Sequence, residues 1–556
     1  MNQHQDKAPQ MVQSSSTNSK PTDASLSHSS NSKDRPKHNT LRPGTLLQKK
    51  SILFSIFVVI WGSWLVRLNN PFYDSEVRIV VGSSTIIGRV HRYQGTDVQL
   101  FGGIPYAEVP IRGLRFRPPV AKASVDTHGH VLDATKPGKA CIQAELPGSM
   151  VSEDCLTITI YRPSGTSTFL DRGQKLPMMV WIHGGGYVVG HGGRYNGVPL
   201  VARSVERDTP VMVVTINYRL GPLGFPQSEA AIKDATVNLG LKDMLAALQW
   251  IKAHGFEFGG DPEKVKIIVS DKVMVMLTAF LQITVFGESA GARAIELLFF
   301  NGHLKGLVRG MILQSSGTVP TVPPTDTHRT NVWDSFVNAT KVCTSSLPGH
   351  KQFDCLRQLD TERIIQAYID EGLTFPTFGN WFPNLDNEIV RVFPSTVHLE
   401  NLGLGNVAVM IGANVDEATF ITPQIVSTPE QVRNTLMAIM SPSPRGEDAL
   451  EAAVNHLLRL YPSDPCLGSP FGTGNSTFGL SREYKRLAAI VTDLLIHAER
   501  RMMLQKLHEA GLGAKAYSYL FADPNAASVF PPEFATQPYT PGSLGGATSV
   551  RFLLRI

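Results

Sequence analysis

Hydrophobic positions along the chain follow two alternating patterns. Apolar runs typical of buried strands occur at residues 177–182 (PMMVWI) and 210–220 (PVMVVTINYRL), and residues 238–254 (NLGLKDMLAALQWIKAH) carry apolar side chains at the spacing of an amphipathic helix. Strands that alternate with helices indicate an α/β protein with a mainly parallel sheet. The alternation starts near Ser75, and no internal repeat or second low-complexity segment interrupts it. We therefore expect one large domain over residues 75–556.

The first seventy residues follow neither pattern. Residues 1–50 are rich in Ser, Asn, Gln, Lys and Pro, so we expect a disordered tail. Residues 51–66 (SILFSIFVVIWGSWLV) are uncharged and follow Lys49 and Lys50. They predict an uncleaved signal anchor, which gives a single-pass membrane protein with a cytosolic tail and a lumenal or extracellular body. Two alternatives stay open: a cleaved signal peptide on a secreted protein, and a buried core helix.

Composition and charge narrow the class of protein. The 556 residues are 42% hydrophobic and 18% charged, which is enough apolar mass for a large core. Residues 1–50 contain eight basic and three acidic residues, a surplus equal to the formal net charge of +5 for the whole chain. The body is therefore balanced, and a body without a basic surplus does not predict nucleic-acid binding.

The first candidate for chemistry is the motif Gly287-Glu288-Ser289-Ala290-Gly291, which follows the apolar run ITVF and precedes a helical stretch. A G-x-S-x-G at such a junction is typical of a nucleophile elbow, where the turn is so sharp that glycine is needed two residues to either side of the serine. The N-terminus of the following helix favours developing negative charge. This context predicts Ser289 as a nucleophile.

Three consecutive glycines, residues 184–186, follow His183 at the end of an earlier apolar run. Such a loop can direct several backbone N–H groups at one point, and the N–H of the residue after the nucleophile, Ala290, would join them in an oxyanion hole. The alternative is a phosphate-binding loop, which would run into a helix with Lys and Ser or Thr. Here the sequence continues as YVVGHGG, so we favour the oxyanion hole.

These segments resemble the type-B carboxylesterases, the family that includes cholinesterases, fungal extracellular lipases and neuroligins. Further matching segments occur in family order, namely FGGIPYAEVPIRGLRFRPP, SEDCLTITIYRP, INYRLGPLGF, FGGDPEKV, GMILQSSG, NVDEATF and AYSYLF. The resemblance covers most of the body. It implies the α/β-hydrolase fold, with a mainly parallel central sheet and helices on both faces.

The resemblance also assigns roles to individual residues. It implies Ser289 as the nucleophile, Gly185, Gly186 and Ala290 as oxyanion donors, and Glu417 as the acid of the triad. Glu417 lies 128 residues after Ser289, and Ala418 replaces the glycine that is usual after the acid. Without the resemblance, Glu417 would be interpreted as a solvated loop carboxylate. No metal or organic cofactor is implied.

Structural features follow from the same resemblance. It implies the disulfides Cys141–Cys155 and Cys343–Cys355, a salt bridge from Arg115 to Glu153, and an odd cysteine, Cys466. Asn338 and Asn475 begin glycosylation sequons, which would be modified in a lumenal compartment. Residues 141–155 contain no aromatic side chain, whereas cholinesterases carry a tryptophan in this loop that stacks on a quaternary ammonium. A choline ester is therefore not expected as the preferred substrate.

The base of the triad does not appear in the sequence. In this fold the histidine follows the acid, and the histidines after Glu417 are His456, His497 and His508, all in stretches predicted to be helical. We interpret each as a surface or packing residue, so no catalytic histidine is identified. The family has a Gly-x-x-His segment beyond the AYSYLF strand. Codon degeneracy permits one in a shifted frame near Gly545, so we hypothesise a frameshift or unrecognised splice there.

Residues 265–282 (VKIIVSDKVMVMLTAFLQ) separate two segments, GGDPEK and ITVFGESAG, that adjoin each other in the family. An insertion at this point is expected to interrupt the buried strand that leads to Ser289, where the backbone must stay paired. The codons of this segment permit the donor, branch and acceptor signals of a short intron. We therefore hypothesise a retained intron.

Together these patterns predict a membrane-anchored serine hydrolase that cleaves a small-molecule or lipid carboxylic ester through an acyl-enzyme. Because the base is missing, little activity is expected from the chain as written. The alternatives are a cholinesterase-like binding protein without catalysis, comparable to neuroligins, and an inactive product of a faulty gene model.

Overall fold

The computed structural model describes a series of segments that belong to one unit starting at Asn70. These are residues 75–122, 131–165, 175–261, 263–264, 267–270, 273–276, 280–281, 283–317, 322–371, 380–392, 394–402, 407–440 and 445–522. The predicted tail, residues 1–50, and the predicted anchor, residues 51–66, lie outside the described residues. Within the described segments, no helix combines the length and the apolar composition needed to cross a membrane.

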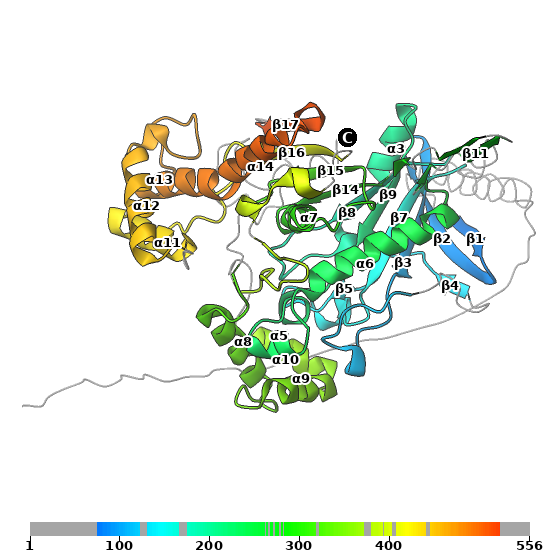
Figure 1. Ribbon diagram of the computed structural model, residues 1–556, viewed down its shortest axis with the longest axis horizontal. Helices are drawn as coiled ribbons and strands as arrows, with labels where there is room; N and C mark the ends of the chain where they lie inside the picture. The colour runs from blue at the N-terminus through cyan, green and yellow to red at the C-terminus, as the bar shows by residue number, and fades with distance from the viewer. Residues whose placement is uncertain are drawn as a thin grey trace, which may run out of the picture. The chain divides into compact units, whose positions relative to one another are not determined.

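A large sheet forms the centre of the fold, in the order β1-β2-β3-β7-β9-β8-β14-β15-β16-β17, with β4 paired to β2 (Figure 1). Its strands are β1 Ser75–Val81, β2 Ser84–Tyr93, β3 Thr96–Pro105, β4 Val131–Asp133, β7 Thr157–Pro163, β8 Met178–Ile182, β9 Met212–Ile216, β14 Ile283–Glu288, β15 Gly310–Gln314, β16 Ala408–Asn414 and β17 Ala516–Phe521. Every neighbouring pair from β9 to β17 is parallel, whereas β1, β2, β3, β7 and β9 pair antiparallel. The predicted mainly parallel sheet is confirmed, with an antiparallel N-terminal part that the sequence analysis did not predict.

Helices cover both faces of this sheet because successive strand residues point to opposite sides. The helices concerned are α3 Val198–Glu206, α6 Leu239–His254 and α7 Ala290–Phe300. Ile182 of β8 packs in the main core with side chains of α6 and α7, whereas its neighbour Trp181 packs with α3 in a second cluster. Both are fully buried. A strand covered on both faces needs an uninterrupted apolar run, which explains the sequence PMMVWI.

The predicted helix over residues 238–254 is α6, but it is not exposed along one face as an amphipathic helix would be. Twelve of its sixteen residues are buried, including Lys242 and Asp243. Arg219 donates from Nε and Nη2 to the Asp243 carboxylate at 2.8 and 2.7 Å, and Lys242 Nζ lies 2.7 Å from Glu388 Oε2. These ion pairs compensate the charges of the polar face, so that face can be buried.

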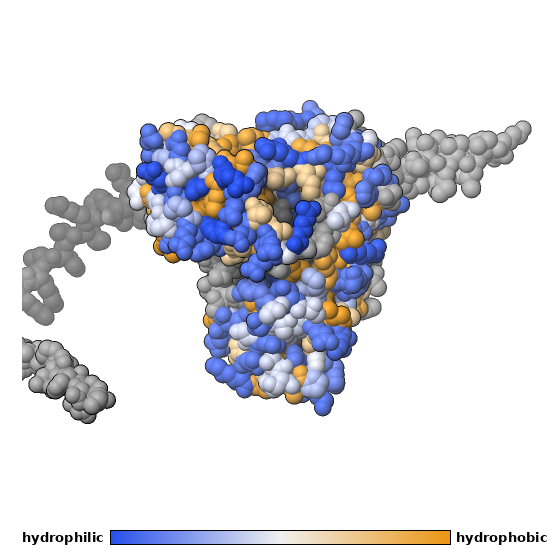
Figure 2. Space-filling view, turned by 60° about the vertical axis from the view of Figure 1, so that its left-hand side comes forward, coloured by the Kyte–Doolittle hydropathy of each residue, from blue (hydrophilic) through white to orange (hydrophobic). Residues whose placement is uncertain are grey.

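Two short helices, α4 Gly221–Gly224 and α5 Glu229–Lys233, precede α6, and the seven later α-helices of the described residues form two groups. They are α8 Thr327–Ala339, α9 Gly349–Gln358 and α10 Thr361–Asp370, then α11 Pro429–Met440, α12 Glu447–Leu460, α13 Arg482–Thr492 and α14 Ala498–Glu509. The first group buries Trp333, Phe336 and Phe353 in the main core. Figure 1 places α8, α9 and α10 in its lower part. Figure 2 is turned about the vertical axis, and in it hydrophilic residues cover most of the same lower part. Helices α11, α12 and α13 enclose a smaller core of their own.

The described strands between Asp261 and Ile283 form two short antiparallel ladders outside the main sheet. Strand β10 (Glu263–Lys264) pairs with β13 (Phe280–Leu281), and β11 (Ile267–Ser270) pairs with β12 (Val273–Met276). Strand β14 then begins at Ile283 and keeps its pairing with both β8 and β15. The expectation that residues 265–282 interrupt the elbow strand is therefore wrong. The described strands of this segment pair with one another, and β14 begins only after them.

Candidate active site

Ser289 lies in the sharp turn between β14 and α7, as predicted. Its backbone has φ 51° and ψ −122°, a conformation that is strained for any residue other than glycine. The turn is held on both sides, since Ser289 N donates to Gln314 O of β15 at 2.9 Å and Arg293 N donates to Ser289 O at 2.9 Å. The surrounding structure therefore fixes the serine at the end of the strand and the start of the helix.

The two motif glycines are required by close packing against strand β8. A Cβ placed on Gly291 would lie 2.1 Å from the carbonyl oxygen of Ile182, and one on Gly287 would lie 2.7 Å from the same atom. Both distances are shorter than a real Cβ tolerates, and the contacted atom is backbone that cannot rotate away. A Cβ on Gly287 would also lie 2.9 Å from the carbonyl carbon of Gly291, so the sharp turn itself excludes a side chain there, whereas at Gly291 the obstacle is the end of β8.

The glycine loop after β8 lies against the nucleophile. Gly185 and Gly186 have φ of 112° and 61°, in the region that favours glycine. A Cβ on Gly184 would lie 3.1 Å from Ser289 Cβ, and Ala290 is the first residue of α7. The structure therefore brings together the predicted nucleophile and the three predicted oxyanion donors.

Glu417 is buried just beyond the end of β16, with 4% of its surface exposed. Its Oε1 accepts hydrogen bonds from Ser315 Oγ at 2.7 Å and from Asn414 N at 2.6 Å, and Oε2 accepts one from Asn414 Nδ2 at 3.2 Å. Burial raises the pKa of this carboxyl, and these hydrogen bonds oppose the rise. The alternative interpretation of Glu417 as a solvated loop carboxylate is therefore excluded. Ser289, through Gln314, and Glu417, through Ser315, are both attached to the end of β15.

A second carboxyl in the site, Glu288, was not singled out in the sequence. A Cβ on Gly184 would lie 2.6 Å from Glu288 Oε2, which places the carboxyl beside the glycine loop. The pKa of Glu288 is raised to about 8, chiefly by burial and then by the charge on Glu417, while Arg194 opposes the rise. Its position next to Ser289 was the one visible signal, because the burial that shifts its pKa comes from distant segments.

The three histidines after the acid lie in helical segments, as predicted. His456 and His508 are exposed residues of α12 and α14. His497 is buried at the end of a π-helical segment, Asp493–His497, and its Nε2 lies 2.9 Å from the carbonyl oxygen of Asn414. A carbonyl only accepts, so this nitrogen donates a hydrogen bond. His497 therefore lies near Glu417 and is held by a hydrogen bond to the backbone at the end of β16.

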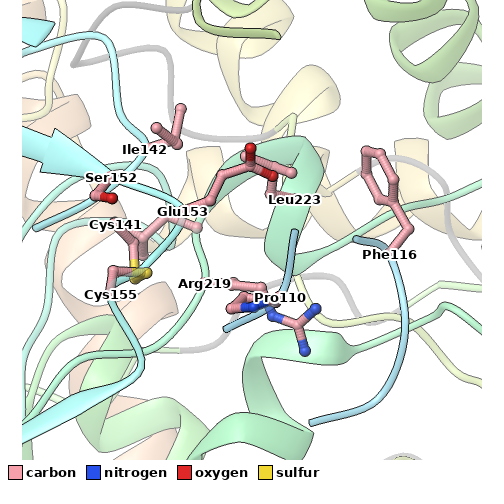
Figure 3. A pocket seen from close by; sticks show the side chains of 10 residues that line it. Pro110, Phe116, Cys141, Ile142, Ser152, Glu153, Cys155, Arg219 and Leu223 are labelled. Atoms are coloured by element: carbon pink, nitrogen blue, oxygen red, sulfur yellow. A yellow bond between two sulfur atoms is a disulfide. The ribbon is translucent and has the colours of Figure 1, made fainter. Parts of the chain in front are cut away.

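A small cavity is lined by ten residues, which include neither the predicted nucleophile nor the predicted acid (Figure 3). Its lining includes both cysteines of the Cys141–Cys155 disulfide, together with Glu153 and Arg219. The cavity has room for a single water molecule. We therefore do not assign it a substrate.

Both disulfides implied by the resemblance are present. The sulfur atoms are 2.07 Å apart in Cys141–Cys155 and 2.06 Å apart in Cys343–Cys355. Cys466 is exposed and, among the described residues, has no disulfide partner; its Sγ donates to Asn475 Oδ1 at 3.2 Å. Asn338 and Asn475 are exposed, and their glycosylation stays a prediction.

The implied salt bridge between Arg115 and Glu153 is also present, and it is buried. Arg115 donates from Nε and Nη2 to the two oxygens of Glu153 at 2.6 and 2.7 Å, and from Nη1 to the carbonyls of Leu356 and Leu359 at 2.7 and 2.6 Å. The side chains are 2% and 3% exposed. The pair therefore ties the N-terminal part of the chain to the end of α9.

Replacing Arg115 with methionine is expected to lower the free energy of unfolding by about 3–5 kcal/mol, because the Glu153 charge would be left buried without its partner. The measurement is urea-induced unfolding. Arg78→Met is the matched control, since Arg78 and Glu76 form a pair in which both side chains are 63% exposed, and such pairs contribute less than about 1 kcal/mol. Equal losses in the two variants would contradict this account.

A strained serine between a parallel strand and a helix, packed against a glycine loop, defines an α/β-hydrolase. The chain belongs to the carboxylesterase family: the sequence profile of that family matches residues 74–271 and 281–546. Residues 272–280, which the profile leaves out, lie inside the predicted insertion. Family membership supports ester hydrolysis as the general chemistry.

Individual relatives agree with this assignment. Lipase 1 of Geotrichum candidum is 31% identical over 452 residues, which is 73% of this chain and 74% of that protein. A secreted triacylglycerol lipase of Gibberella zeae is 29% identical over 480 residues, 80% of this chain and 75% of that protein. The crystal structure of EstA from Aspergillus niger is similar in fold, with a TM-score of 0.63 and 24% identity over 85% of this chain and 80% of that one. The resemblance inferred from the sequence is confirmed.

Proposed function

We propose that this chain is a serine hydrolase of carboxylic esters that works through an acyl-enzyme. Ser289 attacks the ester carbonyl, and the N–H groups of Gly185, Gly186 and Ala290 stabilise the oxyanion. The alcohol leaves, and water then releases the acid. The observation that carries the proposal is the strained backbone of Ser289 between β14 and α7, because such strain persists only where the fold over-determines it.

The acid is proposed to be Glu417, which would orient the base and stabilise its charged form. Its buried carboxyl is held by Ser315 and Asn414, so it has a fixed direction. The substrate is proposed to be a small-molecule or lipid ester, since named relatives are lipases. The name of the Gibberella zeae relative supports a secreted protein, and the anchor at residues 51–66 stays a second proposal for the location.

The base is proposed to come from a corrected C-terminus, and residues 265–282 are proposed to be absent from the mature protein. Two observations support the second point. Strands β10 and β13 pair Glu263 with Leu281, so the two ends of the segment already lie side by side. Strand β14 keeps its pairing without help from the segment. Removing it would join GGDPEK to ITVFGESAG and leave the main sheet unchanged.

Sequencing of the mature transcript across codons 260 to 290 and beyond codon 540 tests both proposals. We expect the eighteen codons to be missing and a Gly-x-x-His segment to follow the codons of β17. The protein translated from that transcript should then react with a fluorophosphonate probe at Ser289, with Ser289→Ala as the control. An unlabelled Ser289 in the corrected protein would overturn the esterase proposal.

One observation favours the second candidate, a binding protein without catalysis. The sequence after Glu417 contains three histidines, and the structure places all three in helical segments, with His497 already engaged by Asn414 O. If the transcript keeps both residues 265–282 and the present C-terminus, the triad has no base and this candidate replaces the esterase.

A further inference from the structure

A buried cluster of charged side chains lies behind the nucleophile, and the proposed mechanism does not use it. Arg293 and Glu296 belong to α7 and Glu499 belongs to α14; their exposed fractions are 3%, 0% and 6%. Arg293 Nη1 lies 3.2 Å from Glu296 Oε2 and 3.0 Å from Glu499 Oε1. Ser316 Oγ also donates a hydrogen bond to Glu296 Oε2. The cluster therefore joins three segments that are far apart in the sequence.

The cluster contains two carboxyl groups but one guanidinium group. Two buried carboxylates close together disfavour each other's charge, so one of them tends to keep its proton. The pKa of Glu296 is raised to about 8, chiefly by burial and then by the charge on Glu499, while Arg293 opposes the rise. A side-chain hydrogen bond between Glu296 and Glu499 also raises this pKa. A hydrogen bond between two carboxyl groups requires that one of them carries a proton.

The segments that meet at this cluster are the ones that carry the site. Arg293 N donates to Ser289 O at 2.9 Å, so the cluster begins one helical turn after the nucleophile. Ser316 follows Ser315, whose hydroxyl donates to Glu417 Oε1 at 2.7 Å. The nucleophile is therefore linked to Arg293 by a backbone hydrogen bond, and the acid is linked to Glu296 through the neighbouring residues Ser315 and Ser316.

The glycine loop is the third element packed against the cluster. Tyr187 follows the three glycines, is fully buried, and its hydroxyl has no hydrogen-bond partner among the described residues. Burial raises the pKa of Tyr187, with Arg293 opposing and Glu296 adding to the rise. The titratable and charged groups facing Glu296 are thus Arg293 from its own helix, Glu499 from α14 and Tyr187 from the loop.

We propose that Glu296 is a positioning residue that keeps one proton in the cluster with Arg293 and Glu499. The neutral Glu296 accepts from Ser316 and donates to the Glu499 carboxylate, while Arg293 pairs with that carboxylate. This arrangement holds α7 against the segments that carry the acid and the glycine loop. Loss of the proton leaves two negative charges beside one positive charge, which loosens the turn that carries Ser289. The positioning role rests on the proposed function, whereas the retained proton does not.

The direction of the pH effect follows from proton linkage. The pKa of Glu296 rises from about 4.5 in the unfolded chain to about 8 in the folded chain. Between pH 4.5 and pH 8, the folded protein therefore binds a proton that the unfolded chain does not bind. The contribution of Glu296 to stability is therefore largest below pH 4.5 and is lost as pH rises to about 8. Glu296→Gln mimics the protonated form, because its amide accepts with one atom and donates with the other.

The test compares urea unfolding of the full chain and of Glu296→Gln between pH 5 and pH 9. We expect the unfolding equilibrium constant of the unsubstituted chain to rise by at least about tenfold relative to that of the variant across this range. Glu509→Gln makes the same change at an exposed site of α14. Its unfolding equilibrium constant should show the same pH dependence as that of the unsubstituted chain. Hydrogen exchange of the peptide covering residues 289–296, corrected for intrinsic pH effects, should speed up above pH 8 in the unsubstituted chain and not in Glu296→Gln.

Equal pH profiles for the chain and Glu296→Gln would overturn the retained proton. A pH-dependent stability difference without any change in exchange at residues 289–296 would overturn the positioning role and leave the proton in place. Neither measurement needs ester hydrolysis, so failure of this inference and failure of the esterase proposal give different results.

Discussion

The chain as written is expected to hydrolyse p-nitrophenyl butyrate at least about 10³-fold more slowly than the same chain extended with a Gly-x-x-His segment after β17. A serine hydroxyl is a weak nucleophile unless a base takes its proton, and the buried carboxyl of Glu417 does not replace an imidazole. What stays in place is the strained Ser289 and the glycine loop, which give residual catalysis by stabilising the oxyanion.

Initial rates at saturating ester, with Ser289→Ala in both chains, measure this effect. In the extended chain the substitution should remove nearly all activity, and in the present chain it should remove little. A family-like rate in the present chain that Ser289→Ala abolishes would show that another group takes the proton. Glu288, whose carboxyl lies beside Gly184 and has its pKa raised to about 8, would then be the residue to replace next.

Local chemistry made the nucleophile predictable from the sequence. The motif Gly287–Gly291 lies within five residues and was recognisable in the sequence, whereas the carbonyl of Ile182, which excludes a Cβ at both glycines, comes from a distant strand. The family resemblance added the features that depend on long separations, such as the Arg115–Glu153 pair and both disulfides. Pairings of that kind cannot be derived from spacing, because many partners are compatible with one sequence.

The features that were missed share a physical cause, which is burial produced by distant segments. Helix α6 was expected to expose one face, but Arg219 and Glu388 compensate its charges. Glu288 and Glu296 are ordinary carboxyls in the sequence, and their pKa values are raised by burial against segments far along the chain. Residues 265–282 were expected to interrupt the strand that leads to Ser289, but β14 begins after them at Ile283, since the sequence does not show at which residue a strand begins.

Replacing Gly291 with alanine is expected to lower the free energy of unfolding by about 4 kcal/mol or more, or to prevent folding. The added Cβ would lie 2.1 Å from the carbonyl oxygen of Ile182 and 2.7 Å from that of His183. Both are backbone atoms of the strand end and glycine loop, so no rotamer change relieves the overlap. The measurement is urea unfolding. Gly113→Ala is the matched control, because nothing lies within 4 Å of its added Cβ, and a change within about 0.5 kcal/mol is expected.

The same substitution connects stability to chemistry. The overlap at Gly291 can be relieved by moving α7 away from β8, and that movement separates Ser289 from the loop that carries Gly185 and Gly186. A Gly291→Ala protein that folds should therefore react more slowly with a fluorophosphonate probe than Gly113→Ala does, when both are made in the transcript-corrected chain. Unchanged stability and unchanged labelling would show that the elbow and β8 are not in close contact. The oxyanion role of the glycine loop would then lose its structural basis.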